Sequence, residues 1–149
     1  MAVPYPALAS LAKQYQAELA GKIVVDITNP LNFETWDELV VPADSSAAQQ
    51  LQKLLPESKV LKAFNNNFAA TLQSGKIGEL PTTVLVAGDD EDAKAAFKSV
   101  LASSALRVLN ASKLKRAREM EATGFLQMTL AASEQIGWDG GFGVVGANK

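Results

Sequence analysis

The sequence predicts an α/β fold in which a doubly wound, mostly parallel sheet is followed by a long C-terminal helix. Four short apolar runs alternate with helical patterns along the 149 residues, and strand–helix–strand alternation is typical of such sheets. The four runs are brief and lean apolar, as strands buried on both faces tend to be. Right-handed crossovers would place helices on both faces of the sheet.

The pattern assigns each element to a range of the sequence. Strands are expected at 22–28, 60–65, 82–88 and 107–110, and helices at 6–20, 46–55, 68–74, 90–103 and 112–136. Ser46 and Gln49 have the spacing of a capping box. Residues 1–4 are interpreted as the tail of a further strand. A sheet that starts there would have an open edge, which we expect to be covered by a second copy, by the C-terminal tail or by additional chain.

The composition excludes several kinds of chemistry. The sequence has no Cys and no His, which excludes disulfides, thiolate catalysis, zinc–thiolate sites and Ser–His or Cys–His pairs. A cofactor with its own reactive centre fits this inventory best. The net charge of −2 gives no general attraction for nucleic acid. No run is long enough to cross a membrane and no signal peptide is recognised, so a cytoplasmic protein is expected.

Two short patterns resemble known motifs without their structural context. Gly141, Gly143 and Gly146 match G-x-G-x-x-G, but that motif needs a following helix to hold the pyrophosphate, so a tail or edge segment is favoured. Asp26 with Pro30 resembles the phosphoacceptor strand of response-regulator receiver domains. The acidic pair that holds magnesium in those domains is missing, and the receiver interpretation remains a minor alternative.

The strongest resemblance is carried by five stretches in a fixed order, VPY (3–5), GKIVVDITNPL (21–31), SSAA (45–48), LP…VLKAFNN (55–66) and LVAGDD (85–90). Together with the long helix and the segment from Trp138 to Phe142, this order resembles the NADPH-dependent reductases of coenzyme F420 and related dinucleotide-binding oxidoreductases. The resemblance implies a partial Rossmann-like fold. Residues 1–149 would form a single α/β domain, the C-terminal portion of such an enzyme without its N-terminal Gly-rich segment.

The resemblance also implies a reaction and its cofactors. Members of this family transfer hydride between NADPH and a deazaflavin- or flavin-like acceptor, which depends on positioning more than on protein acids and bases. Asn65-Asn66 stands where family members often have Asn-Thr, so the acceptor is left open. The alternative is a non-catalytic Rossmann remnant that serves dimerisation or interaction.

Three turns that follow strands, at residues 3–5, 29–31 and 65–67, are expected to border one ligand cleft. Open α/β sheets bind ligands at the carboxyl ends of their strands. No catalytic side chain and no metal ligand is assigned. Turn formation or helix capping is the alternative role of the asparagines, favoured for Asn67. The expected cofactor-binding residues are Val3, Pro4, Tyr5, Asn29, Pro30, Leu31, Asn65, Asn66 and Asn67.

The loop 31–45 leaves the same edge and carries two aromatic residues. Phe33 and Trp36 either cover a ligand or pack onto the domain, and the sequence leaves both open.

Charged clusters are interpreted as structural. Asp89, Asp90 and Asp92 open a helix, which favours acids at its start over a metal site. A second cluster consists of four basic residues, Lys113, Lys115, Arg116 and Arg118. We favour a solvent-exposed face on which they pair with Glu119 and Glu121 over a site that binds an anion.

The helix from Ser112 to Ile136 is apolar beyond one stripe, which indicates burial on more than one side. In the resembling family this region joins subunits, so a homodimer through this helix is expected.

Overall fold

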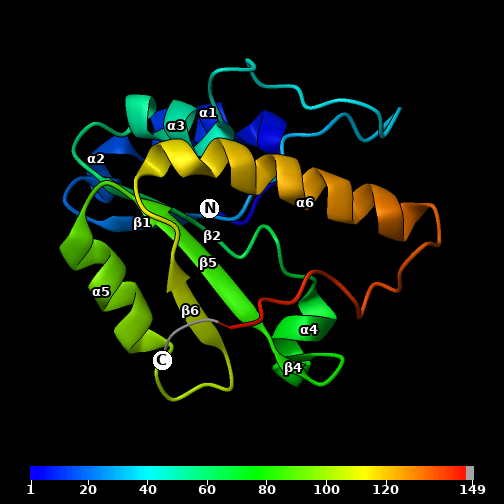
Figure 1. Ribbon diagram of the computed structural model, residues 1–149. Helices are drawn as coiled ribbons and strands as arrows, with labels where there is room; N and C mark the ends of the chain where they lie inside the picture. Colours follow the sequence, from blue (N-terminus) through cyan, green and yellow to red (C-terminus); the bar gives the residue numbers. More distant parts are fainter. Residues whose placement is uncertain (147–149) are drawn as a thin grey trace.

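The fold is a four-stranded sheet with helices on both faces (Figure 1). The computed structural model describes residues 1–146. The strand order is β1-β2-β5-β6. Both outer pairs are parallel and the central pair β2–β5 is antiparallel, which confirms a mostly parallel sheet. The strands are β1 (Ile23–Asp26), β2 (Lys59–Ala63), β5 (Thr83–Gly88) and β6 (Arg107–Asn110).

Helices form close to the expected ranges. The first predicted helix is interrupted at Tyr15, and a small hairpin of β3 (Lys76–Ile77) and β4 (Leu80–Pro81) was not predicted. The helices are α1 (Tyr5–Gln14), α2 (Gln16–Leu19), α3 (Ala47–Leu54), α4 (Ala69–Ser74), α5 (Glu91–Val100), the 3₁₀ helix η1 (Leu114–Arg116) and α6 (Ala117–Ala132).

Two apolar clusters lie on opposite faces of the sheet. Val24 and Val60 point to the face covered by α1, α3 and η1, whereas Leu61 and Val86 point to the face covered by α5. Adjacent residues of a strand point to opposite faces, so β2 is buried on both sides. The doubly wound arrangement is therefore confirmed.

Two predicted helix starts are capped by side chains, of which the Ser46 cap was expected. The Ser46 hydroxyl accepts a hydrogen bond from the Gln49 amide at 3.1 Å, and Asp90 accepts one from the Ala93 amide at 2.7 Å. Each cap satisfies a backbone donor that the helix itself leaves free. Asp89 instead accepts from the Leu114 amide at 3.1 Å. Within residues 1–146 no acidic cluster has the arrangement of a metal site.

The expected helix 112–136 is wrong at both ends. Ser112 has a positive φ of 77°, the 3₁₀ helix η1 precedes α6, and Glu134 leaves the helix with a φ of 60°. These left-handed conformations interrupt the helix although the local composition favours its continuation. The inner face of α6 is also more polar than expected, since Glu121 and Gln127 are buried there.

The outer edge of β1 is partly covered by the N-terminal residue. The Met1 amino group donates to the Val25 carbonyl, and the Ile27 amide donates to the Met1 carbonyl at 3.3 Å. Met1 thus lies beside β1 in the manner of a neighbouring strand, in line with the interpretation of residues 1–4 as the tail of one. Ile23, further along this edge, is 41% exposed.

A completely buried ion cluster lies beneath α6. Asp26 and Lys62 are register partners on β1 and β2, and Lys62 Nζ lies 2.9 Å from Asp26 Oδ2 and 2.9 Å from Glu121 Oε1. The ammonium also donates to the Thr28 carbonyl. Asp26 and Lys62 are 0% exposed and Glu121 is 1% exposed. We call Asp26, Lys62 and Glu121 the buried triad.

The triad reaches a fourth element through Glu121. Its carboxylate accepts from the Ala47 amide at 2.9 Å and the Ala48 amide at 3.3 Å, at the start of α3. A carboxylate at a helix N-terminus is favourable. Burial nevertheless raises the pKa of Glu121, with Lys62 opposing that shift. Asp26 is sealed inside this cluster, which is incompatible with a phosphoacceptor and excludes the receiver interpretation.

We predict that Lys62→Met lowers the free energy of unfolding by about 3–5 kcal/mol, because it leaves two buried carboxylates without their cation. Urea denaturation of the two proteins measures the difference. Lys59→Met is the matched control, since Lys59 pairs with Asp90 at the surface and such pairs contribute at most about 1 kcal/mol. Equal losses in the two variants would contradict the prediction.

Candidate functional site

Two asparagine turns meet at the carboxyl ends of β1 and β2. Asn29 Nδ2 donates to the Asn65 carbonyl at 2.9 Å, and Asn65 Nδ2 donates to Asn29 Oδ1 at 3.1 Å. Because β1 and β2 are parallel, both turns leave the same edge of the sheet, where open α/β sheets bind ligands. The structure therefore brings together the two turns that the sequence singled out.

Helix α6 closes over these turns through its backbone. The Met120 carbonyl accepts from Asn65 Nδ2 at 2.9 Å and from Asn66 Nδ2 at 2.8 Å. One turn later the helix has Gly124, where a Cβ would lie 2.6 Å from Asn29 Oδ1 and 2.9 Å from Asn65 Nδ2. Only glycine allows α6 to approach the paired asparagines this closely.

A cavity of about 510 Å³ opens beside the paired asparagines. Amide side chains form part of its wall and the remainder is apolar or aromatic; no charged residue of the range 1–146 lines it. The Phe68 and Trp138 rings lie 4.9 Å apart, centroid to centroid. Its lining comprises Ile27, Asn29, Phe64, Asn65, Asn67, Phe68, Ala69, Ala70, Met128 and Trp138. Concave, mostly apolar surfaces with a few convergent polar groups are typical of small-molecule sites.

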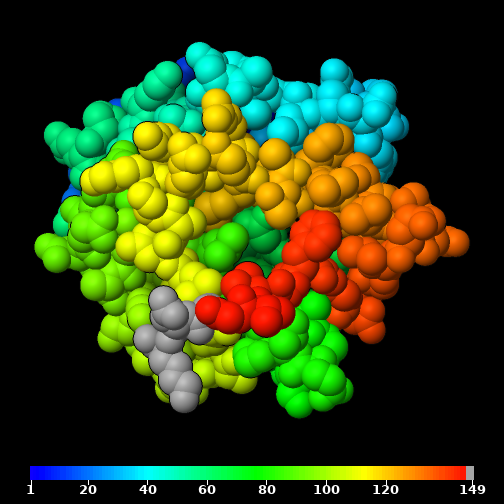
Figure 2. Space-filling model, viewed as in Figure 1, coloured from blue at the N-terminus to red at the C-terminus, as the bar shows by residue number. Residues whose placement is uncertain are grey.

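The segment 137–146 passes next to the cavity, and two side chains hold it in place by hydrogen bonds. Gln127 Oε1 accepts from the Phe142 amide at 3.2 Å, while Gln127 Nε2 donates to the Asn66 carbonyl at 3.1 Å. Arg107 donates to the Val144 carbonyl. In Figure 2 this red segment lies between orange α6 and the green α4 region. Gly141, Gly143 and Gly146 lie on it, in backbone without helix or strand.

The three turns expected to border the cleft contribute unequally to the lining of the cavity. Asn29, Asn65 and Asn67 line the cavity, whereas Asn66 does not. Asn67 donates to the Thr83 carbonyl at 3.0 Å. It is not the cap of α4, because Phe68 occupies that position without a side-chain bond; the capping interpretation of Asn67 is wrong.

Pro30 and Leu31 are buried and do not line the cavity. Leu31 bridges to Leu39 and so closes the base of the 31–45 loop.

The first expected turn lies away from the cavity. Tyr5 donates its hydroxyl to Gln50 Oε1 at 2.6 Å, Pro4 precedes the first turn of α1, and Val3 packs against the core beneath α1 and α3. The structure thus gives Val3, Pro4 and Tyr5 packing and capping contacts.

Phe33 and Trp36 pack against each other edge to face at 5.4 Å. Neither lines the cavity, and Phe33 is 52% exposed. The cavity is walled instead by Phe64, Phe68, Met128 and Trp138. Sequence reasoning did not assign these residues to the site, although Phe64 and Phe68 flank the expected asparagines.

The basic run is paired only in part as expected. Glu119 lies 3.3 Å from Arg116 and 2.8 Å from Arg118. Glu121 pairs with Lys62 inside the core, so its expected pairing with the basic run is wrong.

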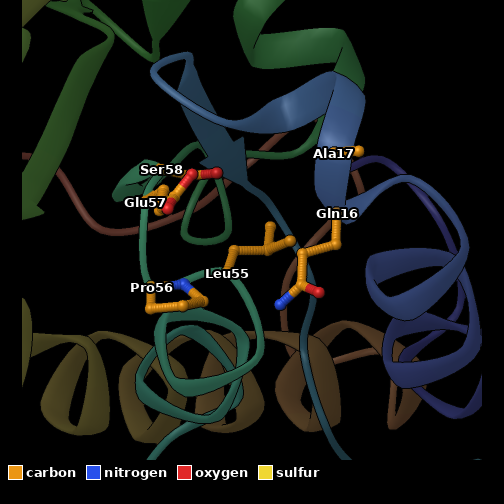
Figure 3. A pocket seen from close by; sticks show the side chains of 6 residues that line it. All are labelled: Gln16, Ala17, Leu55, Pro56, Glu57 and Ser58. Atoms are coloured by element: carbon orange, nitrogen blue, oxygen red, sulfur yellow. The ribbon is translucent and has the colours of Figure 1, made fainter.

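Further hollows lie away from the asparagine turns. One of about 430 Å³ separates the 31–45 loop from α6. Another, of about 260 Å³, lies between α2 and the segment that leads into β2 (Figure 3). Leu55, Pro56, Glu57 and Ser58 line this second hollow, at the amino end of β2. It is therefore at the opposite end of the strand from Asn65.

Comparison with known proteins finds reductases of similar sequence. No family model matches it. The F420-dependent NADP reductase of Methanocaldococcus jannaschii is 35% identical over 126 residues, which cover 82% of this chain. The chain is a homologue of the F420-dependent NADP reductases. It spans 56% of the length of that relative.

Other proteins share the sequence and the fold. The metalloreductase STEAP3 of Rattus norvegicus is 36% identical over 118 residues, covering 79% of this chain and 22% of its own. A crystal structure of a candidate F420-dependent NADP reductase from Arthrobacter sp. FB24 superposes with a TM-score of 0.85 at 28% identity, covering 97% of this chain and 67% of its own. A hypothetical protein, SMa0349, from Sinorhizobium meliloti reaches 0.67 at 26% identity, covering 76% and 55%.

We predict that Gly124→Ala separates α6 from the paired asparagines, even though alanine is the better helix former by about 1 kcal/mol. The added methyl group would collide with Asn29 and Asn65. The side-chain amide NMR signals of these two residues should shift and exchange faster. Thr123→Ala, a change at an exposed position of α6, is the control; unchanged amide signals in Gly124→Ala would contradict the prediction.

Proposed function

We propose that the chain provides the substrate-facing part of an NADP-linked oxidoreductase that transfers hydride between NADPH and a deazaflavin- or flavin-like acceptor. The observation that carries this proposal is the convergence of the Asn29 and Asn65 turns on one cavity at the carboxyl ends of β1 and β2. The homology to an F420-dependent NADP reductase supports it.

The lining of the cavity suits a flat heteroaromatic ring. Phe64, Phe68 and Trp138 offer aromatic faces, which pack well against planar rings. The amides of Asn29, Asn65 and Asn67 also line the cavity, and amides can bind polar ring edges. Among the described residues no Lys or Arg lines the cavity, so we place the phosphates of a dinucleotide outside it.

The chemistry requires little from protein side chains. The nicotinamide supplies the hydride when NADPH is bound, and the protein holds the two rings together and keeps water away. A sequence without His or Cys is compatible with this task. The apolar residues Ile27 and Met128 contribute to the exclusion of water from the cavity.

A chimera tests this proposal directly. The chain would be joined to the part of the Methanocaldococcus jannaschii reductase that lies outside the matched region, and NADPH oxidation would be followed with F420 as acceptor. We expect hydride transfer by the chimera and weak or no NADPH binding by the present chain alone. A folded chimera that binds neither NADP nor NAD would contradict the proposal and favour a non-catalytic interaction module.

The two tryptophans provide a matched pair of variants in that chimera. Trp138→Ala should lower kcat/KM about tenfold, because it removes an aromatic wall of the cavity. Trp36→Ala should leave kcat/KM within about twofold, since Trp36 contacts Phe33 away from the cavity. Equal effects of the two substitutions would count against the cavity as the reaction site.

We further propose that two copies associate through the outer face of α6. Leu126, which is 52% exposed on this helix, would be covered in such a dimer. Leu126→Glu should convert a dimer into a monomer in light-scattering measurements, whereas Val100→Glu, at the 79% exposed end of α5, should not. A monomer before any substitution would refute this interface.

A further inference from the structure

The three successive asparagines after β2 all use their amide NH₂ groups to bind backbone carbonyls. Asn65 and Asn66 donate to Met120, and Asn67 donates to Thr83. A carbonyl only accepts hydrogen bonds, so each contact fixes which end of the amide faces it. The side-chain oxygens of all three are therefore directed away from these carbonyls.

These oxygens lack hydrogen-bond donors. Among the residues that the structure describes, none donates to Oδ1 of Asn65, Asn66 or Asn67, and all three oxygens are buried. Asn65 as a whole is only 6% exposed. Buried polar groups are normally paired, so a cluster of unpaired acceptors calls for a partner.

We propose that Asn65 and Asn67 select the bound ring by offering it acceptors only, so that the ring must carry N–H donors at its edge. Both residues line the cavity. The inference rests on the proposed function, because it assumes that one of the two hydride-exchanging rings enters this cavity. It adds to the proposed function that the site recognises hydrogen-bond donors at the edge of the ring.

Two ring systems carry such donors. The carboxamide of nicotinamide has an NH₂ group, and the pyrimidine part of a flavin or deazaflavin has a lactam N–H. A carboxylate or an acetyl group in the same position has no donor and would leave the asparagine oxygens unpaired, which a site of this polarity rejects strongly.

Access to the oxygens requires a lining side chain to move, because they are covered in this structure. Trp138 is 51% exposed and belongs to the irregular segment that follows α6. We expect this side chain to move aside as the ring enters, and then to pack on its face.

Matched pairs of ring ligands test the inference on the full chain. Isothermal calorimetry would compare 5-deazariboflavin with its N3-methyl derivative, and nicotinamide mononucleotide with its 3-acetylpyridine counterpart. In each pair the second compound lacks the donor. We expect at least one donor-bearing compound to bind about tenfold more tightly than its counterpart, and the pair that responds identifies the ring.

The other outcomes separate this inference from the proposed function. Equal affinities within both pairs would overturn the donor requirement while leaving ring binding intact. Failure of all four compounds to bind both this chain and the reductase chimera would overturn the proposed function, and the donor requirement with it.

Two asparagine variants locate the effect. Asn67→Leu should reduce the affinity ratio within the responding pair toward one, by weakening only the donor-bearing compound. Asn66→Leu is the control, because Asn66 makes the same kind of bond to a carbonyl but does not line the cavity. In this variant the affinity ratio should stay as it is in the unsubstituted chain. A ratio that survives in both variants, or is lost in both, would contradict the assignment to Asn67.

Discussion

The buried ammonium group of Lys62 is the interaction on which the rest of the structure depends. It joins Asp26 of β1, the Thr28 carbonyl that precedes the first asparagine turn, and Glu121 of α6. Glu121 in turn binds two amides at the start of α3. One cation thus holds two strands and two helices in a fixed relation. Burial of charge is costly unless every member is paired, so this geometry tolerates little displacement.

The geometry of the asparagine site depends on the buried triad. Glu121 is adjacent to Met120, whose carbonyl binds Asn65 and Asn66. The next turn of α6 has Gly124 against the paired asparagines, and the turn after it has Gln127, which binds both the Asn66 carbonyl and the Phe142 amide. The inner face of α6 therefore carries a succession of polar and small residues that positions the turn after β2, then the cavity wall, then the C-terminal segment.

The sequence predicts the parts of this architecture that are encoded locally. Continuous apolar runs located all four strands of the sheet. The spacing of Ser46 and Gln49 predicted a helix cap, the acids at 89–92 predicted a helix start, and the carboxyl-end rule placed Asn29 and Asn65 at one edge. These features depend on a few neighbouring residues or on the general handedness of strand connections.

The buried triad could not be predicted in this way. Lys62 lies within an apolar strand, Asp26 ends another strand, and Glu121 stands beside a basic run in which Glu119 is an equally good surface partner. The contacts that decide between these roles join residues far apart in the sequence. Helix α6 ends early for a related reason, since the backbone at Glu134 adopts a left-handed conformation that composition does not reveal. Trp138 lies in the cavity wall on a segment held by Gln127 and Arg107 and packs on Phe68, contacts that also join residues distant in the sequence.

NMR detection of the Lys62 ammonium group at neutral pH tests this account most directly. The account predicts slowly exchanging Nζ protons with through-space contacts to the groups around Asp26, Thr28 and Glu121, because the ammonium is sealed from solvent and fully hydrogen-bonded. An Nζ signal that exchanges with water as rapidly as that of the surface residue Lys59 would show that the cluster is open, and would contradict the account.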